Sequence, residues 1–200
     1  MMASSGGADT DTRDDVDPTH LREAMGQFAS GVTVVTTATG EQDDLDAHGM
    51  TANAFTSVSL RPALVLISVS NAATTHRRIA ESGRYGISVL SADQKSLSEH
   101  FAGGAQRPDL VRFVWRDRLP LVADSLVQLT CTVRQSHLAG DHTVYIGAVD
   151  GLWNASGSPL VRYGKKMYIL DISCQDGPSA PSRAEDALNG GQMGRPTYAR

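Results

Sequence analysis

The sequence contains very few cysteines and no cluster of residues with the spacing of a metal site. Its 200 residues include two cysteines, Cys131 and Cys174, and no Cys-x-x-Cys pair or His/Cys cluster with metal-site spacing. We therefore expect no metal site. Cys131 alternates with apolar Leu129 and Val133, a pattern typical of a small buried residue on a strand.

A basic excess and a long apolar run are also missing. Eighteen Lys and Arg face 22 Asp and Glu, which gives a net charge of -4 and argues against nucleic acid as the main partner. No apolar run approaches the roughly 20 residues of a membrane span, so we expect no membrane insertion. The polar, acidic N-terminus also lacks the apolar core of a secretory signal. These absences predict a cytoplasmic protein.

Hydrophobic residues are nearly absent from both ends of the chain. Residues 1–16 and 173–200 are rich in Ser, Gly, Thr, Asp and Pro. Such segments cannot bury enough apolar surface to offset their chain entropy, so we expect two disordered tails. The length suits one domain, which we place at 17–172.

Between the tails, short apolar and alternating runs predict about seven strands or more. They cover 32–38, 48–51, 63–70, 85–89, 111–115, 127–133, 143–153, 160–163 and 166–170. Capping residues and apolar spacing predict three short helices. The first starts at Asp17-Pro18, carries an apolar stripe of Leu21, Met25 and Phe28, and ends at Gly31; the others cover 71–81 and about 91–102.

Turns, rather than helical crossovers, join most of these strands. This favours an antiparallel β-barrel with helices packed outside it over a doubly wound sheet. There is no G-x-G-x-x-G after a strand and no G-x-x-x-x-G-K-[ST]. A nucleotide cofactor would therefore bind without a Rossmann or P-loop site.

The segment 49–60 (GMTANAFTSVSL) is small, rich in hydroxyl groups and uncharged, although it lies between two apolar runs. Its backbone could closely approach a flat polar ligand, which would supply partners for its hydrogen-bonding groups. The alternative is a Ser/Thr-rich strand and turn of a barrel without a ligand.

Two further segments have possible chemistry. In 70–78 (SNAATTHRR) a strand ends and a helix begins, which provides free N–H groups, hydroxyls and cations for a phosphate. An ordinary capped helix with a solvated basic face explains that segment equally well. Gly140-Asp141-His142 could be a simple hairpin turn, or His142 could have a functional role.

Taken in order, four segments resemble the flavin reductase family, the NAD(P)H:flavin oxidoreductases that serve two-component monooxygenases. They are FASGVTVVT (28–36), GMTANAFTSVSL (49–60), PALVLISV (62–69) and GDH (140–142). The resemblance implies a mainly β fold, the FMN-binding split β-barrel of antiparallel Greek-key type, with short helices packed outside. It also implies a homodimer.

The resemblance further implies which residues contact the ligands. Those of the isoalloxazine platform would be Met50, Thr51, Ala52, Asn53, Ser57, Val58 and Ser59. Those at the ribityl and phosphate end would be Ser70, Asn71, Thr74, Thr75 and His76. His142 matches the family position that meets the nicotinamide, so it is the expected catalytic residue.

The implied reaction is hydride transfer from NADH or NADPH to flavin N5. The flavin would be FAD or FMN, either bound or as a passing substrate, and the reduced form (FADH2 or FMNH2) would leave for a partner monooxygenase. Two alternatives stay open: a flavin-retaining oxidase of the pyridoxine-phosphate-oxidase type, and a non-catalytic flavin-binding dimer. The Gly-Asp-His segment favours catalysis over both.

Overall fold

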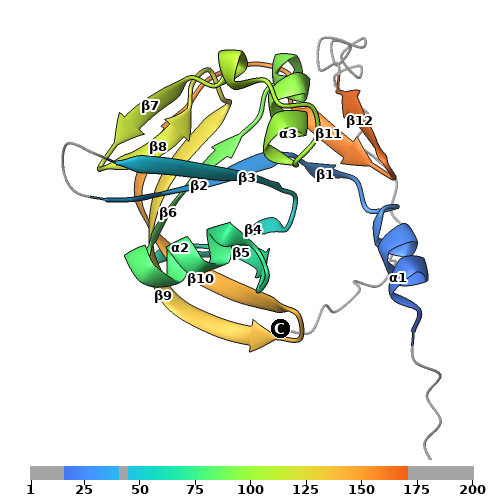
Figure 1. The fold of residues 1–200 in the computed structure, drawn as a ribbon, viewed down its shortest axis with the longest axis horizontal. Coiled ribbons are helices and arrows are strands. Elements are labelled where there is room, and N and C mark those ends of the chain that lie inside the picture. The colour runs from blue at the N-terminus through green and yellow to red at the C-terminus, as the bar shows by residue number, and fades with distance from the viewer. Residues whose placement is uncertain (1–15, 41–44, 171–200) are drawn as a thin grey trace, which may run out of the picture. The chain divides into compact units, whose positions relative to one another are not determined.

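A computed structural model describes residues 16–40 and 45–170 of the chain (Figure 1). The predicted tails lie outside these residues, except for Val16, and so does Cys174. Every strand pairing in the described chain is antiparallel. The prediction of a mainly β, antiparallel fold is therefore confirmed.

The largest sheet has seven strands in the order β3-β2-β6-β9-β10-β5-β4. Their bounds are β2 Thr33–Thr39, β3 Asp46–Ala52, β4 Phe55–Leu60, β5 Ala63–Ser70, β6 Arg84–Val89, β9 Val127–Ala139 and β10 His142–Asn154. β3 and β4 stand at opposite ends of this order, yet only two residues of chain join them. The sheet therefore curls until its two end strands approach each other, which produces a split barrel (Figure 1).

Two smaller sheets and several short helices complete the described chain. The small sheets are β1-β11-β12 (Ser30–Gly31, Leu160–Tyr163, Lys166–Ile169) and β7-β8 (Phe113–Arg116, Leu119–Val122). The helices are α1 Pro18–Met25, α2 Thr74–Ser82, α3 Lys95–Phe101 and the 3₁₀ turns η1 Ala92–Gln94 and η2 Pro108–Leu110. None of the helices in the described ranges is long and apolar enough to span a membrane.

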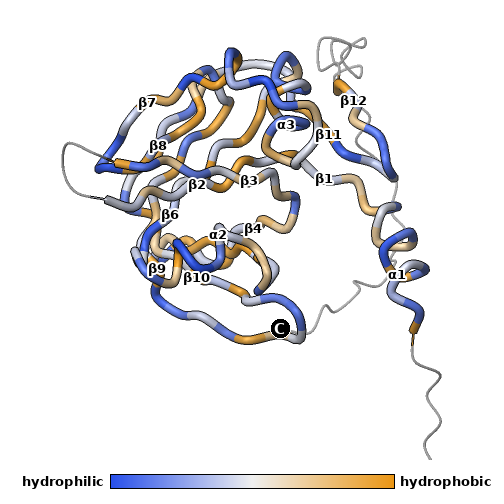
Figure 2. Tube along the Cα trace, in the orientation of Figure 1, coloured by the Kyte–Doolittle hydropathy of each residue, from blue (hydrophilic) through white to orange (hydrophobic). Residues whose placement is uncertain are grey.

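Apolar side chains of neighbouring strands form the core of the barrel. Apolar residues, coloured orange in Figure 2, recur along these strands. Val35, Ile67, Ile87 and Leu129 are buried there together with Cys131. The prediction for Cys131 is thus confirmed, and burial raises the pKa of its thiol to about 12. A second cluster, which includes Val34 and Leu90, covers the other face of β2, because side chains alternate along a strand.

Helices α2 and α3 pack on the outside of the barrel, as the sequence predicts. α2 buries Thr75 and Ile79 against it, and Gly83 ends this helix in the left-handed conformation. α3 lies against β3, where the Phe101 ring packs directly on Gly49. A Cβ atom at Gly49 would come within 2.7 Å of that ring, so only glycine permits this contact.

The first helix differs from its prediction. Asp17 caps α1 through bonds from the N–H groups of Thr19 and His20, as expected, but the helix ends at Met25. The predicted end at Gly31 is wrong because Gly26 caps the helix and Gly31 lies in β1. Leu21, Met25 and Phe28 do not form a buried stripe, and Phe28 lies outside the helix.

Candidate functional site

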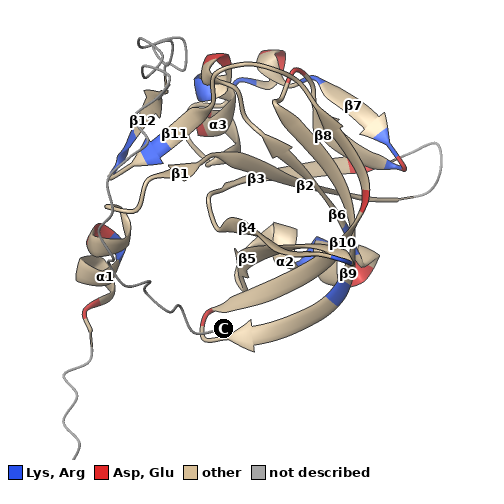
Figure 3. Cartoon of the chain, turned by 180° about the vertical axis from the view of Figure 1, so that it is seen from behind, with Lys and Arg blue, Asp and Glu red and all other residues tan. Residues whose placement is uncertain are grey.

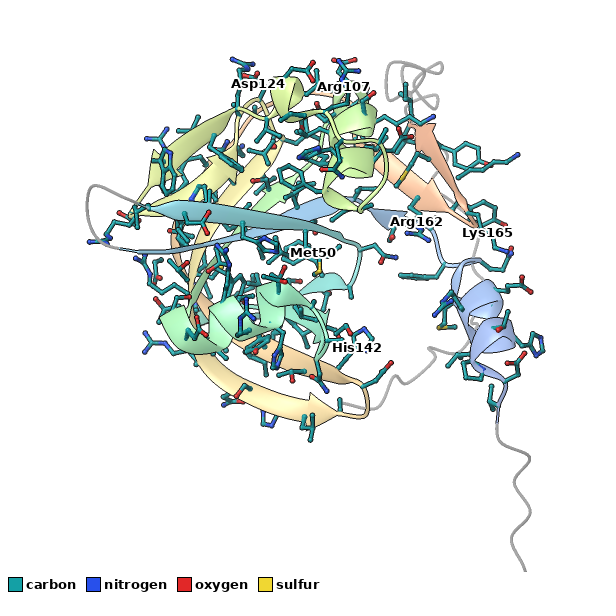
Figure 4. The ribbon with its side chains drawn as sticks, viewed as in Figure 1. Met50, Arg107, Asp124, His142, Arg162 and Lys165 are labelled. Carbon is teal, nitrogen blue, oxygen red and sulfur yellow. The ribbon has the colours of Figure 1, made fainter. Side chains whose placement is uncertain are left out.

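The hydroxyl-rich segment 49–60 divides between the two end strands of the sheet. β3 ends at Ala52, and Asn53 and Ala54 connect it to β4. The Ala54 carbonyl accepts a bond of 3.1 Å from the Ser68 N–H, which ties this connection to β5. In Figure 4, Met50 lies near this connection. The segment thus forms the rim where the barrel is split.

β4 is an edge strand, and its middle is open to a ligand. Its pairing with β5 shifts register between Ser57 and Ser59, so Val58 is an extra residue in a bulge. Thr56, Ser57 and Val58 are exposed. An edge strand presents unpaired N–H and C=O groups. Here they accompany the exposed hydroxyls of Ser57 and Thr56, the latter of which donates a long bond of 3.4 Å to the Ser57 carbonyl. The rim therefore provides the donors and acceptors that the polar edge of a flat ring requires.

The β3 part of the segment is already engaged within the fold. The Thr51 hydroxyl donates a 2.6 Å bond to the Ser98 carbonyl and so attaches α3 to the sheet. Met50 and Ala52 pack against the barrel core. The Asn53 amide donates to the Ser30 hydroxyl over 3.4 Å. Of the predicted platform, Asn53, Ser57 and Val58 are therefore the exposed residues, whereas Ser59 is half-buried and its hydroxyl accepts from the Arg61 N–H at 3.2 Å.

The start of α2 provides a place for an anion. Ala73 is its N-cap and has no side chain to cap the helix, so the N–H groups of Thr74 and Thr75 have no intrahelical acceptor. The Ser70 hydroxyl stands next to them and accepts from the Ala72 N–H at 3.4 Å. Free N–H groups at a helix N-terminus suit a phosphate, and Thr74 is exposed beside them.

The other predicted residues of this segment bond to the protein. Thr75 is buried, and its hydroxyl shares a 3.1 Å bond with Nε2 of His48. The side chains of Asn71 and His76 turn toward β10 and bond there. Ser70 and Thr74 therefore remain as the hydroxyls of this set that face outward.

His142 begins β10 and pairs directly with Ser70, the last residue of β5 (Figure 4). Its Nδ1 atom and Oδ1 of Asp141 lie 2.7 Å apart. The hydrogen bond from His142 holds the pKa of Asp141 below its usual range, so Asp141 remains a carboxylate acceptor. Nδ1–H therefore donates to Asp141, and Nε2 of the half-exposed ring is available to a ligand.

The segment 47–60 carries no fixed charge, whereas helix α2 carries positive charge. Residues 47–60 contain no Asp, Glu, Lys or Arg, and the corresponding strands are tan in Figure 3. Arg77 and Arg78 follow on α2, and Arg78 pairs with Asp46 at 2.6 Å. This arrangement suits a ligand with a neutral ring at one end and a phosphate at the other.

One cavity lies beside this site, and a larger one lies away from it. One of about 610 Å³ lies beside α1 and has Asn53, Phe28 and Arg162 on its wall. A larger one of about 860 Å³ surrounds η1, far from the rim in sequence, and none of the predicted site residues lines it. The described residues contain no group of His, Cys, Asp and Glu suited to a metal ion.

Comparisons with known proteins identify the family of this chain. The family model described as "Flavin reductase like domain" matches residues 25–171. The chain belongs to the flavin reductase family. An NADH-dependent flavin reductase of Rhodococcus sp is 55% identical over 164 residues, which cover 82% of this chain and 93% of the relative.

Other members of the flavin reductase family bear on substrates and partners. The structure of the Streptomyces globisporus NADH:FAD oxidoreductase SgcE6, in complex with NAD and FAD fragments, has a TM-score of 0.71 and 33% identity, covering 79% of this chain and 95% of that one. The Mycobacterium tuberculosis protein HsaB, a reductase subunit of a flavin-dependent monooxygenase, is 36% identical over 68% of this chain and 72% of its own length.

Two polar residues of the site were not predicted from the sequence. Asp141 orients the His142 ring, and Thr143 bonds to both Asn71 and His76. The sequence predicts for Asp141 only a place in a hairpin turn. The sole signal in the sequence was their position beside His142.

Proposed function

We propose that this protein is an NADH- or NADPH-dependent flavin reductase that supplies FMNH2 or FADH2 to a partner monooxygenase. The observation that carries the proposal is the arrangement of the rim. An uncharged polar edge strand, β4, and the strand β10, which begins with the His142 imidazole directly opposite Ser70, flank β5 on its two sides, and the uncapped start of α2 follows β5 in the chain. Family membership and the activity named for the Rhodococcus relative support it.

The residues of the rim fit a flavin. Ser57, Val58 and Ser59 would lie along the polar edge of the ring, where N–H and O–H groups stabilise added negative charge. Ser70 and Thr74, with the free N–H groups of α2, would hold the ribityl and phosphate end. The bound flavin supplies the redox chemistry, since it accepts a hydride from the dinucleotide.

His142 would orient the nicotinamide. Its Nδ1 is committed to Asp141, so the ring has one fixed tautomer and presents Nε2. A proton shuttle is not required of it, because hydride transfer needs alignment of the two rings at roughly 3–3.5 Å.

The deciding experiment measures NADH and NADPH oxidation with FMN, FAD and riboflavin in turn. We expect turnover with at least one pair, with release of reduced flavin. Tight co-purification of flavin and direct use of dioxygen without NADH turnover would indicate the oxidase alternative. Flavin binding without any turnover would indicate a binding protein instead.

We expect His142→Ala to raise the KM for NADH about tenfold or more, equivalent to roughly 1.4 kcal/mol of binding, while flavin affinity changes little. The reason is that the imidazole would meet the nicotinamide and not the flavin. Steady-state kinetics and flavin fluorescence quenching give the two quantities. His137→Ala is the matched control, because His137 is an exposed histidine of the same hairpin. If His142→Ala weakened NADH and flavin binding equally, or changed neither, the assignment of His142 to the nicotinamide would be wrong.

We further propose that residues 17–172 act as one domain in a homodimer in the cytoplasm. Leu21, Met25 and Phe28 are 50%, 62% and 77% exposed around α1, which a second copy would cover. The partner monooxygenase would receive diffusing reduced flavin, in keeping with HsaB being the reductase subunit of a flavin-dependent monooxygenase.

A further inference from the structure

The side chain of Asn71 is devoted to the β9–β10 hairpin. Oδ1 accepts a 2.7 Å bond from the Thr143 hydroxyl, and Nδ2 donates to the Gly140 carbonyl at 3.3 Å. The backbone N–H of Asn71 donates to the Asp141 carbonyl at 2.9 Å. Three hydrogen bonds of Asn71 thus connect it to one hairpin, about 70 residues away in the sequence.

A second group fixes Thr143 from the α2 side. Nε2 of His76 lies 3.1 Å from the Thr143 hydroxyl oxygen. Because that hydroxyl donates its hydrogen to Asn71, it must accept from Nε2–H of His76. Tyr145 supports the same histidine: its hydroxyl donates to the His76 carbonyl at 3.4 Å, and the two rings lie 5.9 Å apart.

Thr143 is buried, so its hydrogen bonds hold the backbone beside His142 in place. Thr143 is 7% exposed, whereas the side chain of neighbouring His142 is 43% exposed and projects to the opposite face of β10. Bonds to Gly140, Asp141 and Thr143 therefore hold the backbone on both sides of His142. The rotamer of the imidazole depends on that backbone.

We propose that Asn71 and Thr143, supported by His76, form a clamp that positions His142 for the dinucleotide. Asn71 and His76 then act as positioning residues for the turn, in place of direct contacts with flavin. The kinetic part of this proposal rests on the proposed function, whereas the clamp itself does not.

Thr143→Val is the primary test, since it keeps the shape of the side chain and removes both bonds. We expect the KM for NADH to rise about three- to tenfold, in line with the loss of one or two hydrogen bonds, with kcat at saturating NADH and the flavin Kd within about twofold of wild type. Thr143→Ser, which retains the hydroxyl, should restore the KM. Thr132→Val is the matched control, because Thr132 also loses one hydroxyl bond, a 2.6 Å bond to Asp150 on the same hairpin. An unchanged KM, or an equal loss of flavin affinity, would overturn the proposal.

A double variant separates positioning from general structural damage. If Thr143 acts through His142, adding Thr143→Val to His142→Ala should leave the KM for NADH within about twofold of that of His142→Ala alone. If the increases in the KM for NADH of the two single variants multiplied in the double variant, Thr143 would act independently of His142.

Hydrogen exchange tests the clamp without any enzyme activity. Peptides that cover 138–146 should exchange faster in Thr143→Val than in wild type and in Thr132→Val, and unchanged exchange would overturn the clamp. Exchange could be faster in Thr143→Val as expected while the wild-type protein oxidises neither NADH nor NADPH with any flavin. In that case the proposed function fails, and the clamp stands without its kinetic role.

Discussion

At the scale of single residues, His48 is a histidine whose pKa is lowered by its surroundings in the fold. It lies in β3 and bonds to the buried Thr75 hydroxyl of α2 at 3.1 Å. Burial, and after it the positive charge of Arg78, lowers the pKa of His48 below its usual range. The folded protein therefore favours the neutral imidazole.

This direction determines how the stability changes with pH. Below about pH 6.5, the ordinary value for histidine, the unfolded chain takes up a proton at His48 that the folded protein resists. Acid therefore removes stability through this group, and the loss ends once the pH is below the pKa in the folded state. We expect His48→Gln, which lacks the titration, to lose less stability than wild type between about pH 7.5 and 5.5.

Thermal melting at several pH values checks this expectation. The gap between the wild-type and His48→Gln Tm values should narrow as the pH falls. His137→Gln, at an exposed position on β9, serves as the control and should follow wild type. Parallel curves for wild type and His48→Gln would show that His48 does not couple folding to protons.

The residue scale also shows how far the sequence can define the site. Segment order and residue type placed the rim, the α2 start and His142 in one candidate set, and the fold brings Ser70 and His142 together. The sequence could not show that Asn71 and His76 bond to Thr143, because these partners lie 72 and 67 positions away. Short polar side chains look alike whether a ligand or another strand receives their bonds.

At the scale of elements, the contact of β6 with β10 depends on a glycine. Gly147 adjoins a register shift between β9 and β10, and a Cβ atom there would strike the Tyr85 hydroxyl. Tyr85 is fully buried, and desolvation by this burial raises its pKa well above the usual range. Neither ring nor strand can move aside easily in a packed interior.

We expect Gly147→Ala to destabilise the protein by about 1–3 kcal/mol through overpacking. Denaturant unfolding gives the free energy directly. Adding Tyr85→Phe removes the oxygen that meets the new methyl group, so the double variant should recover part of the loss. Tyr85→Phe alone provides the reference. Strictly additive losses would mean that the two groups do not collide.

Element prediction succeeded where a pattern was local. β5 at Ala63–Ser70 agrees with its predicted bounds, and the capping box of Ser91 and Gln94 is present. β8 at Leu119–Val122 was not predicted, since it is short, contains Pro120 and follows a turn with positive φ at Arg118. The extent of α1 was overestimated because Gly26, rather than Gly31, ends it.

At the scale of the whole molecule, α1 is loosely attached to its own barrel. No residue of α1 is buried. Its links to the β11–β12 hairpin are polar: Glu23 with Lys165 at 3.2 Å, and Gln27, just beyond the helix, with Tyr163 at 2.7 Å. Exposed ion pairs contribute little to stability, so these contacts hold α1 only weakly. The apolar side chains of this segment stay exposed to solvent.

If a second copy covers these apolar side chains, Phe28→Asp should weaken the dimer. Loss of one buried aromatic costs about 1.5–3 kcal/mol, so we expect the dissociation constant to rise about 10- to 100-fold. Sedimentation or light scattering over a dilution series measures it. Leu152→Asp, at an exposed leucine on β10, is the control and should leave the mass unchanged. An unaltered mass for Phe28→Asp at every dilution would exclude this surface from the dimer.

β5 pairs with β10 without interruption. The face to which the His142 imidazole points therefore depends on whether the number of residues between it and Ala148 is odd or even. Seven consecutive pairs join Leu64–Ala148 to Ser70–His142, and outward and buried side chains alternate along them. An insertion of one residue between Ala148 and His142 would rotate the imidazole into the barrel wall, whereas an insertion of two would restore its face. Length changes in this strand therefore preserve the face of the imidazole in even steps, or in odd steps that a bulge such as the one at Val58 absorbs.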